Sequence, residues 1–410
     1  MSVGSETGRA RAAAVVLVGG QLLAAVGALA VNLLAARVLD PSARGDLAYA
    51  LQLSYFVSVF AVMGLERPFM ASRTGAFNPE YRVFVRLITP GTIAVIPCVV
   101  IATAFSPFST SWLWVGAGVI AVYVALNSLT MSVRVAYVTS MDWRRFGFNA
   151  IAAQLIIIAG AGLLVILGVS DPVAWMGIYA ASGIPAVVLL WLAVRRGPEP
   201  EWPTDEQRRA LRRRGWVLLP SAFSNTAMMH SDRLLLPILS SSAELGLYVT
   251  VATVLQMATW PVQQWVDASL RRWSQTMRDR SLSMGPLLLQ SFLLLVAMSA
   301  IMGVAAYLMI LFVLPDTYRA ATTVILPLAI ASVIFGLTRV QQGILIALGA
   351  EGRVSAVEIL GTAVSLLAYV ALIPGYGMLG AAYGSIIGYS ACAVAAAFAL
   401  ISVNRTRRNP

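Results

Sequence analysis

Residues 225–248, NTAMMHSDRLLLPILSSSAELGLY, decide how the rest of the chain is interpreted. An apolar segment that opens at Trp216 carries Asp232 and Arg233 in its interior and ends in the polar turn 240–244. An Asp or Arg at the centre of a membrane helix is unfavourable by about 2.5–3.5 kcal/mol each. We therefore expect these two side chains to pair with each other or to face water.

The composition is that of a polytopic membrane protein. Of 410 residues, 59% are hydrophobic and only 11% are charged, and the mean hydropathy is +0.80. A soluble domain carries about 25% charged residues. Apolar segments of about 20 residues recur along the chain, which is the length that spans a bilayer as a helix. The predicted fold class is all-α, with twelve transmembrane helices.

The twelve segments can be read directly from the sequence. They are roughly 13–38, 46–65, 83–106, 112–134, 146–168, 173–194, 216–239, 244–267, 286–314, 319–348, 354–373 and 378–402. The triplet Ala28-Leu29-Ala30 resembles a signal-peptidase site, but the apolar run continues past it, which favours a first membrane helix over a cleaved leader.

The basic residues predict the orientation. All 29 are arginines, and most lie on one side if the N-terminus is cytoplasmic. Because cytoplasmic flanks carry the excess of Lys and Arg, both termini are predicted to be cytoplasmic. The net charge of +11 is then explained by topology and anionic lipid, which disfavours a nucleic-acid partner.

The longest polar stretch, 195–215, is rich in proline and then in arginine, and it predicts a linker with a short amphipathic surface helix. The sequences on either side repeat at an offset of about 200. Gly45 and Tyr49 follow one polar turn, and Gly246 and Tyr248 follow another. We predict two parallel six-helix lobes, residues 1–200 and 216–410, joined by 201–215, with the binding site between them.

The chain lacks the residues of a metal or cofactor site. Cys98 and Cys392 lie in apolar segments without CxxC spacing, and His230 is the single histidine. The loops expected outside the membrane are a few residues long and carry Asp171 and Asp316 as isolated acids. We therefore expect no cofactor and no enzymatic activity.

Three stretches at matching spacing resemble a known family. They are Ala36 to Pro41 with Gly45, Asp232 to Leu236 with Gly246 to Tyr248, and Ile373 to Ala382. The chain resembles polysaccharide flippases of the O-antigen type, in the multidrug/oligosaccharidyl-lipid/polysaccharide (MOP) exporter superfamily, over nearly its whole length. Pro237 and the serine run depart from the glycine that usually ends the family's seventh helix.

The resemblance implies a V-shaped pair of lobes around a central cavity, and transport by alternating access. The implied substrate is a polyprenyl-pyrophosphate-linked oligosaccharide, moved from the inner to the outer leaflet of the bacterial cytoplasmic membrane for lipopolysaccharide or exopolysaccharide synthesis. Membrane lipids and other polysaccharide-assembly membrane proteins are the implied partners.

Arg339 is the strongest candidate for binding the substrate. It lies nine residues before Leu348, ~13 Å from the predicted inner end of its helix. Ser332 and Gln342 share its face of the helix. A guanidinium binds phosphate oxygens in a bidentate manner, so a cavity-facing Arg339 would suit pyrophosphate. The alternatives are an interhelical salt bridge, with Glu358 or Asp267 as partner, and a side chain that extends to the membrane surface.

Asp232 and Arg233 lie ~25 Å along their predicted helix. Asp232 is a candidate gate or coupling group because an Asp at low dielectric can carry a proton. The alternative is a structural ion pair. Asn225 lies on the same face as Asp232, and Asn32 occupies the position near Arg233 in the repeat; Asn32, Asn225 and Arg233 are predicted to bind substrate.

A second group of polar residues follows the eighth segment at helical spacing: Gln256, Trp260, Gln263 and Asp267. A polar stripe in a membrane helix avoids lipid, so it lines either the cavity or a helix–helix contact. The first three are predicted to bind substrate, and Asp267 is a candidate coupling group. Trp260 would either stack on a sugar ring or pack in the protein interior.

Four charged residues lie near the predicted cytoplasmic ends: Arg86, Arg134, Glu66 and Glu358. Surface charge is the simpler interpretation. A ring of arginines at the inner mouth would also collect an anionic head group, so Arg86 and Arg134 are predicted to bind substrate and the two acids to act as gates.

Two other classes compete with the flippase. A membrane glycosyltransferase, ligase or polymerase that uses the same lipid carrier needs acidic residues in a sizeable external loop, which is absent from the predicted topology. A cation-coupled drug exporter of the same superfamily needs an acidic, aromatic cavity, whereas the buried charges here tend to be arginines. A lipid II flippase usually has more than twelve helices.

Overall fold

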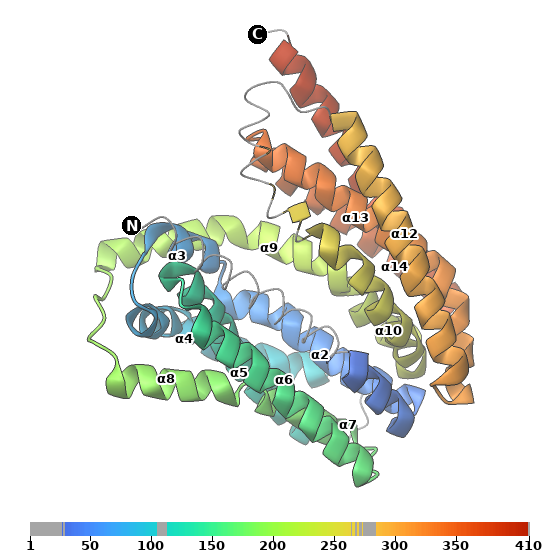
Figure 1. The fold of residues 1–410 in the computed structure, drawn as a ribbon, viewed down its shortest axis with the longest axis horizontal. Helices are drawn as coiled ribbons and strands as arrows, with labels where there is room; N and C mark the ends of the chain where they lie inside the picture. Colours follow the sequence, from blue (N-terminus) through green and yellow to red (C-terminus); the bar gives the residue numbers. More distant parts are fainter. Residues whose placement is uncertain are drawn as a thin grey trace, which may run out of the picture. The chain divides into compact units, whose positions relative to one another are not determined.

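The computed structural model describes residues 29–104, 113–263 and 284–408, together with Gly27, Trp265, Val266, Ser269 and Trp273. Within these residues the secondary structure is entirely helical (Figure 1). In the described part of the chain, nine helical stretches are long and apolar enough to span a membrane. The predicted all-α polytopic membrane fold is therefore confirmed.

The helix count is consistent with twelve. The last apolar stretch, Glu351–Val403, contains two helices because the chain reverses at Gly377, which adds one crossing to the nine. Residues 216–239 and the short apolar helix Leu29–Val38 account for the two remaining predicted segments. The total of twelve membrane helices stays a prediction, because part of the chain lies outside the described ranges.

The chain forms two compact units, residues 1–39 with 50–223 and residues 40–49 with 224–410. They differ from the predicted lobes in two places. Asp40–Tyr49 belongs with the second unit, and the division falls at 223/224 inside a helix rather than in the linker. The predicted lobe boundaries stay a prediction.

Unit 1 is a bundle of helices in which neighbours in space are often not neighbours in sequence. Its elements are α2 (Pro41–Val62, whose first turns belong to unit 2), α3 (Glu66–Ser72), α4 (Phe77–Ala104), α5 (Leu113–Ser140), α6 (Trp143–Ile166), α7 (Pro172–Ala181), α8 (Ile184–Arg196) and the first part of α9 (Asp205–Leu239). Helix α4 packs against α5 and α8. Tyr81 of α4 fixes this contact, because its buried hydroxyl donates to the Ala186 carbonyl of α8 at 2.9 Å.

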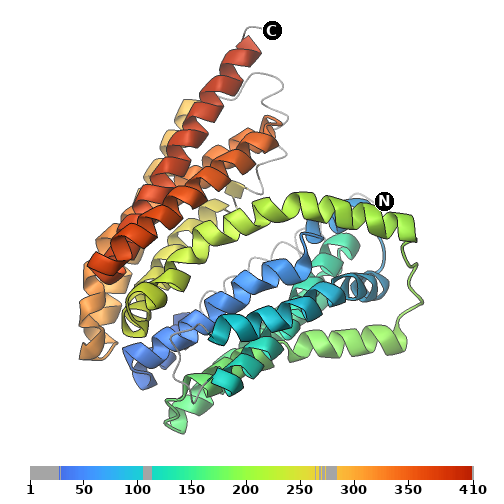
Figure 2. The same ribbon diagram turned by 180° about the vertical axis from the view of Figure 1, so that it is seen from behind.

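Unit 2 contains the rest of α9, then α10 (Ser242–Gln256), η2 (Met257–Thr259), α12 (Met284–Phe312), η3 (Asp316–Val324), α13 (Ile325–Ala347) and α14 (Glu351–Arg408). Helix α13 packs against both α12 and α14 (Figure 2). The buried side chains of Phe335, Ile344 and Leu345 on α13 form the centre of its apolar core.

Helix α9 differs from the sequence prediction. The basic part of the expected linker is the start of a continuous 35-residue helix and not a separate surface helix. Thr204 begins it with a reciprocal cap: the Gln207 amide donates to the Thr204 hydroxyl, and the Thr204 amide donates to the Gln207 side chain. Leu211 then packs into the core of unit 1 beside Leu65 and Phe84. The non-helical connection between α8 and α9, called here the linker, is residues 197–204, within unit 1.

Gly45 and Gly246, the paired glycines of the sequence repeat, meet within unit 2. Their main-chain nitrogens are so close that a Cβ on Gly246 would lie 3.1 Å from the Gly45 nitrogen and would overlap the carbonyl of Pro41. A Cβ on Gly45 would overlap the carbonyl of Ser242. Only glycine allows two helices to approach this closely. The adjacent Arg44 is buried and its Nε donates to the Thr250 hydroxyl at 3.0 Å.

Helix α14 reverses at Gly377, whose φ of 54° and ψ of −129° suit glycine. The reversal frees main-chain donors. One of them, the Met378 amide, donates to the Glu244 carboxylate at 2.7 Å, and Ser240 donates to the same carboxylate at 2.8 Å. Glu244 at the start of α10 therefore anchors the turn between the two halves of α14.

We expect Glu244→Ala to lower the thermal unfolding midpoint of the purified protein. The Met378 amide loses a charged acceptor, a change that destabilises by about 1–3 kcal/mol. Glu351→Ala, which removes an exposed glutamate from the first turn of α14, is the matched control. Equal midpoints for the two variants would contradict the anchoring role.

Candidate functional site

Polar side chains of α9, α10, α13 and α14 surround a cavity inside unit 2, called here the α9–α10 cavity. Its volume is about 50 Å³, and Asp232, Arg233, Tyr248, Gln256, Ser332 and Tyr389 are among the residues that line it. One water needs ~10–15 Å³ of such volume, so the cavity can hold a few waters or a small ion. It is too small for a pyrophosphate or a sugar.

Asp232 and Arg233 both face this cavity, but they do not pair with each other among the described ion pairs. The Tyr248 hydroxyl donates to Asp232 Oδ2 at 2.7 Å, and Arg233 Nη2 donates to Gln256 Oε1 at 3.0 Å. Adjacent residues on a helix point about 100° apart, which favours different partners. In place of the ion pair that was one of the expected arrangements, each of the two side chains makes a separate contact with α10.

Both groups retain unused hydrogen-bonding capacity. Asp232 Oδ1 and Arg233 Nε are buried and have no hydrogen-bond partner among the described residues. A buried, unsatisfied polar atom is costly, by about 1–3 kcal/mol and more for a charged group. Waters in the α9–α10 cavity would satisfy them. The cavity has room for a small polar species beside both groups.

Arg339 lies in a contact between α13 and α14. Its Nη1 is 3.4 Å from Glu358 Oε1 and donates to Gln342 Oε1 at 3.0 Å, while the guanidinium lies over the ring of Phe335. Glu358 is buried and Arg339 is partly exposed, so the pair joins the two helices with its carboxylate enclosed by their packing. This is the interhelical salt bridge that the sequence analysis gave as an alternative. A role for Arg339 in substrate binding stays a prediction.

The predicted polar stripe of the eighth segment is only partly continuous. Helix α10 ends at Gln256 and is followed by one 3-10 turn, η2, which ends two residues before Pro261. Proline lacks the amide that would continue the helix, which explains the break. Gln256 contacts Arg233, Gln263 donates to Thr259 at 3.1 Å, and Trp260 is exposed. Asp267 lies outside the described residues.

The two predicted asparagines behave differently. Asn32 in unit 1 is buried, and neither atom of its amide has a hydrogen-bond partner among the described residues. The main chain of Asn225 is helical, but its side chain lies outside the described set.

The remaining predicted residues lie in unit 1. Arg86 lies over the ring of Trp202, 4.6 Å from its centroid, and Arg134 is exposed on α5. Burial raises the pKa of Glu66 at the start of α3, while the positive charges of Arg134 and Arg67 partly offset this effect. Arg134 and Glu66 are therefore near one another, whereas Glu358 belongs to unit 2.

Two residues of the α9–α10 cavity were absent from the sequence prediction. Tyr248 was part of a motif, but nothing in the spacing showed that its hydroxyl would meet Asp232. Tyr389 lies on the second half of α14, and its hydroxyl donates to the Met228 carbonyl of α9 at 3.2 Å. Isolated tyrosines in apolar helices are weak signals, since most are only packed.

Among the described residues, no three His, Cys, Asp or Glu side chains lie close enough to hold a metal ion.

The amino-acid sequence matches a known protein family. Residues 34–323 match the family described as "Polysaccharide biosynthesis protein". The chain belongs to this family. The match covers more than half of the chain, including α2 to α12 and the linker. The resemblance drawn from the three sequence motifs is thereby confirmed. A comparison with curated proteins found no match.

Solved structures show the same fold. An inward-facing multidrug resistance MATE family transporter of the MOP superfamily aligns with a TM-score of 0.68 and 13% identity, over 94% of this chain and 95% of that chain. The lipid II flippase MurJ in an inward closed conformation aligns with a TM-score of 0.66 and 10% identity, over 93% and 86%. A MOP superfamily transporter from Pyrococcus furiosus aligns with a TM-score of 0.57 and 16% identity, over 94% and 93%.

These proteins are transporters and a flippase rather than enzymes, in agreement with the expectation from the short loops. The chain is a multi-pass membrane protein of the polysaccharide biosynthesis family with the MOP transporter fold.

Proposed function

We propose that the protein translocates a polyprenyl-pyrophosphate-linked oligosaccharide from the inner to the outer leaflet by alternating access. The observation that carries this proposal is the family match over residues 34–323 on a chain with the MOP fold. The family match to polysaccharide biosynthesis supports a glycan as the substrate, and the transporter fold supports its movement across the membrane. A lipid-linked precursor is the form of a sugar chain that a membrane transporter can move as one unit.

The charges of the chain support an anionic substrate. All 29 basic residues are arginines, and arginine is the cation best suited to phosphate. Arg233 in unit 2 and Arg86 and Arg134 in unit 1 are the proposed contacts for pyrophosphate, together with Arg339. Asn32, Asn225, Gln256, Trp260 and Gln263 are proposed to contact the glycan.

The acidic residues are proposed to act in the cycle rather than in recognition. Asp232 faces the α9–α10 cavity, where it can change partners between Tyr248 and water. Glu358, Glu66 and Asp267 are proposed as gating groups, because each places a carboxylate near arginines or at the end of a membrane helix. The α9–α10 cavity has room for only a few waters, so the proposed contacts of Arg233 and Gln256 with the large substrate require this part of unit 2 to open during the cycle.

A cation-coupled drug exporter is the second candidate, because a MATE family transporter shares the fold. Among the described residues the buried charges are Arg44 and Arg233 on one side and Glu80, Asp232 and Glu358 on the other, so the expected excess of buried arginine is not found. The family match to polysaccharide biosynthesis is what favours the flippase.

Deletion of the gene tests the proposal. We expect a complete repeat unit on the polyprenyl carrier to accumulate on the cytoplasmic leaflet, measured by mass spectrometry of lipid-linked sugars and by their accessibility to an external glycosidase. A truncated glycan would indicate a glycosyltransferase. Unchanged glycans together with raised sensitivity to cationic drugs would indicate the exporter.

Both termini and the linker are proposed to lie on the cytoplasmic side of a bacterial cytoplasmic membrane. In a variant without Cys98 and Cys392, a cysteine at Ser109 should react with an impermeant maleimide added to intact cells, and a cysteine at Thr204 should react only after lysis. The reverse pattern of labelling would show that the proposed orientation in the membrane is wrong.

A further inference from the structure

A second, larger cavity lies in unit 1, where the linker Gly197–Thr204 meets α4; it is called here the linker cavity. Its volume is about 580 Å³. This falls within the ~300–1,000 Å³ of pockets that bind small molecules. Its walls come from three separate pieces of chain: one face of α4, the linker, and the first turns of α9.

Three arginines line the linker cavity: Arg86 from α4, and Arg208 and Arg212 from α9. Arg208 pairs with Asp205. Among the described residues, neither Arg86 nor Arg212 has a carboxylate partner. The cavity therefore presents two uncompensated guanidinium groups, which are the donors that best match phosphate oxygens.

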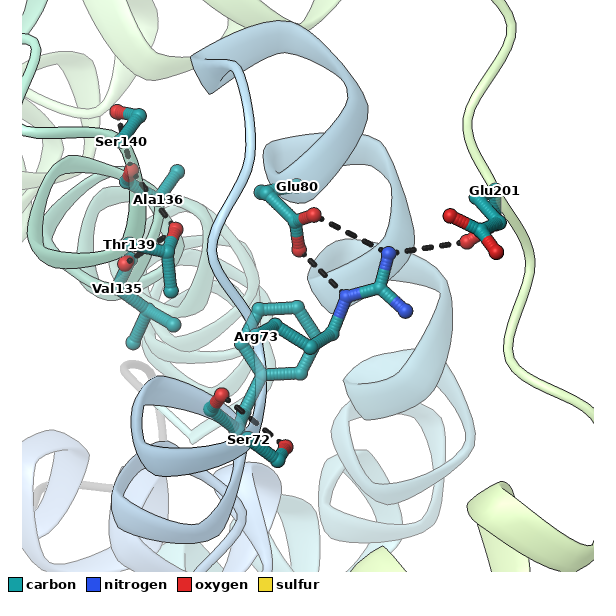
Figure 3. Close-up of polar contacts among 9 residues, drawn as sticks. Ser72, Arg73, Glu80, Val135, Ala136, Thr139, Ser140 and Glu201 are labelled. Atoms are coloured by element: carbon teal, nitrogen blue, oxygen red, sulfur yellow. Dashed lines mark hydrogen bonds and ion pairs between the residues drawn. The ribbon is translucent and has the colours of Figure 1, made fainter.

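The linker wall is held firmly in place. Arg73 forms two hydrogen bonds to the buried carboxylate of Glu80, at 2.7 and 3.1 Å, and a third to the Glu201 carbonyl at 3.0 Å (Figure 3). Arg82 donates to the Pro198 carbonyl at 3.3 Å. These arginines fix the main chain on both sides of Pro200, so the cavity does not depend on a freely moving loop.

The cavity has an apolar side as well as a basic one. Val83 and Leu87 are buried on α4 and contribute to the wall, with Pro90 one turn further on. The guanidinium of Arg86 stacks on Trp202, which holds it toward the linker. A ligand that fits both sides carries a phosphate next to a hydrocarbon or glycerol group. A free inorganic anion would leave the apolar wall unused.

We propose that the linker cavity binds the phosphate of an anionic lipid head group. Basic pockets at the ends of membrane helices take such head groups because charge and an apolar surface meet there. Two sources supply this chemistry: a bulk phospholipid such as phosphatidylglycerol, and the polyprenyl pyrophosphate carrier. Binding of a bulk phospholipid is independent of the proposed export function; binding of the carrier rests on it.

The test uses the full-length protein in detergent. Arg86→Gln/Arg212→Gln removes the two unpaired charges of the cavity. Arg209→Gln/Arg213→Gln is the matched control, since both residues are exposed on the same turns of α9 and do not line the cavity. Lipid retention is measured by native mass spectrometry after addition of phosphatidylglycerol, phosphatidylethanolamine or polyprenyl pyrophosphate.

We expect wild type and control to retain phosphatidylglycerol or polyprenyl pyrophosphate over phosphatidylethanolamine, and the cavity variant to bind it about tenfold more weakly or worse. Thr89→Trp, which fills the cavity from α4 without changing charge, should reproduce the loss if the double variant fails to fold. Preference for phosphatidylglycerol identifies bulk lipid as the source, and preference for the polyprenyl compound identifies the carrier.

Equal retention by the cavity variant and the control, or no preference for an anionic lipid in wild type, would overturn the proposal. These results are independent of the accumulation of lipid-linked sugars in the deletion strain. A protein that binds phosphatidylglycerol here but does not export a glycan would refute the proposed function and leave the linker cavity intact.

Discussion

Gly246→Leu is expected to remove nearly all folded protein from the membrane fraction. A side chain at this position overlaps the Pro41 carbonyl, which is main chain and cannot rotate aside. Overpacking against side chains typically destabilises by about 1–3 kcal/mol, and a clash with main chain exceeds this because two helices must separate. The amount of monodisperse protein after extraction, followed by size-exclusion chromatography, measures the effect.

Gly118→Leu is the matched control. It makes the same substitution inside α5, where a Cβ meets no atom within 4 Å. We expect its yield to stay near wild type, and Gly45→Leu to behave as Gly246→Leu does, since its Cβ would overlap the Ser242 carbonyl. Normal yield from both repeat-glycine variants would show that the helices can separate at this contact without loss of folding.

Arg339→Met is expected to lower the amount of folded protein strongly, because it leaves the carboxylate of Glu358 buried without its arginine. Breaking a buried ion pair from one side destabilises by about 3–5 kcal/mol. Replacing both members removes the uncompensated charge, so Arg339→Met/Glu358→Gln should recover most of the stability. Thermal unfolding of the three proteins measures these two steps.

The double variant separates the structural role of Arg339 from a role in binding. If Arg339 contacts pyrophosphate during transport, the double variant should regain stability but still fail to export glycan. If the arginine only joins α13 to α14, export should return along with stability. Glu358→Gln alone is the control, since it keeps Arg339 and its contact with Gln342. Full export by the double variant would end the binding hypothesis.

The membrane helices were largely predictable because hydropathy is a local property. Each apolar run of about 20 residues has to span the bilayer wherever it lies in the chain. The predicted start of α9 at residue 216 was wrong for the same reason, since hydropathy does not mark where a helix begins. The charges at 208–214 and Pro203 suggested a linker, yet main-chain hydrogen bonding continues through exposed arginines as readily as through leucines. The helix had to begin at its cap, Thr204, rather than where the apolar run begins.

The polar contacts were less predictable because they depend on which helices meet. The sequence identified Asp232, Arg233 and Arg339 as the charged residues that need partners. It could not show that Tyr248 would donate a hydrogen bond to Asp232 or that Gln256 would accept one from Arg233. Glu358 was one of two acids named for Arg339, and the packing of α13 on α14 selects it. The linker cavity joins residues about 120 positions apart, beyond the reach of any periodicity.

The way the linker is held has a consequence for how its sequence can change over evolution. Arg73 and Arg82 donate hydrogen bonds to the main-chain carbonyls of Glu201 and Pro198, groups that every amino acid has. Substitutions at 199–201 therefore leave the two attachments in place, and homologous linkers are free to drift in composition. A one-residue insertion between the attachments would displace one carbonyl from its arginine. Natural variation in this segment should consequently conserve length far more strictly than identity.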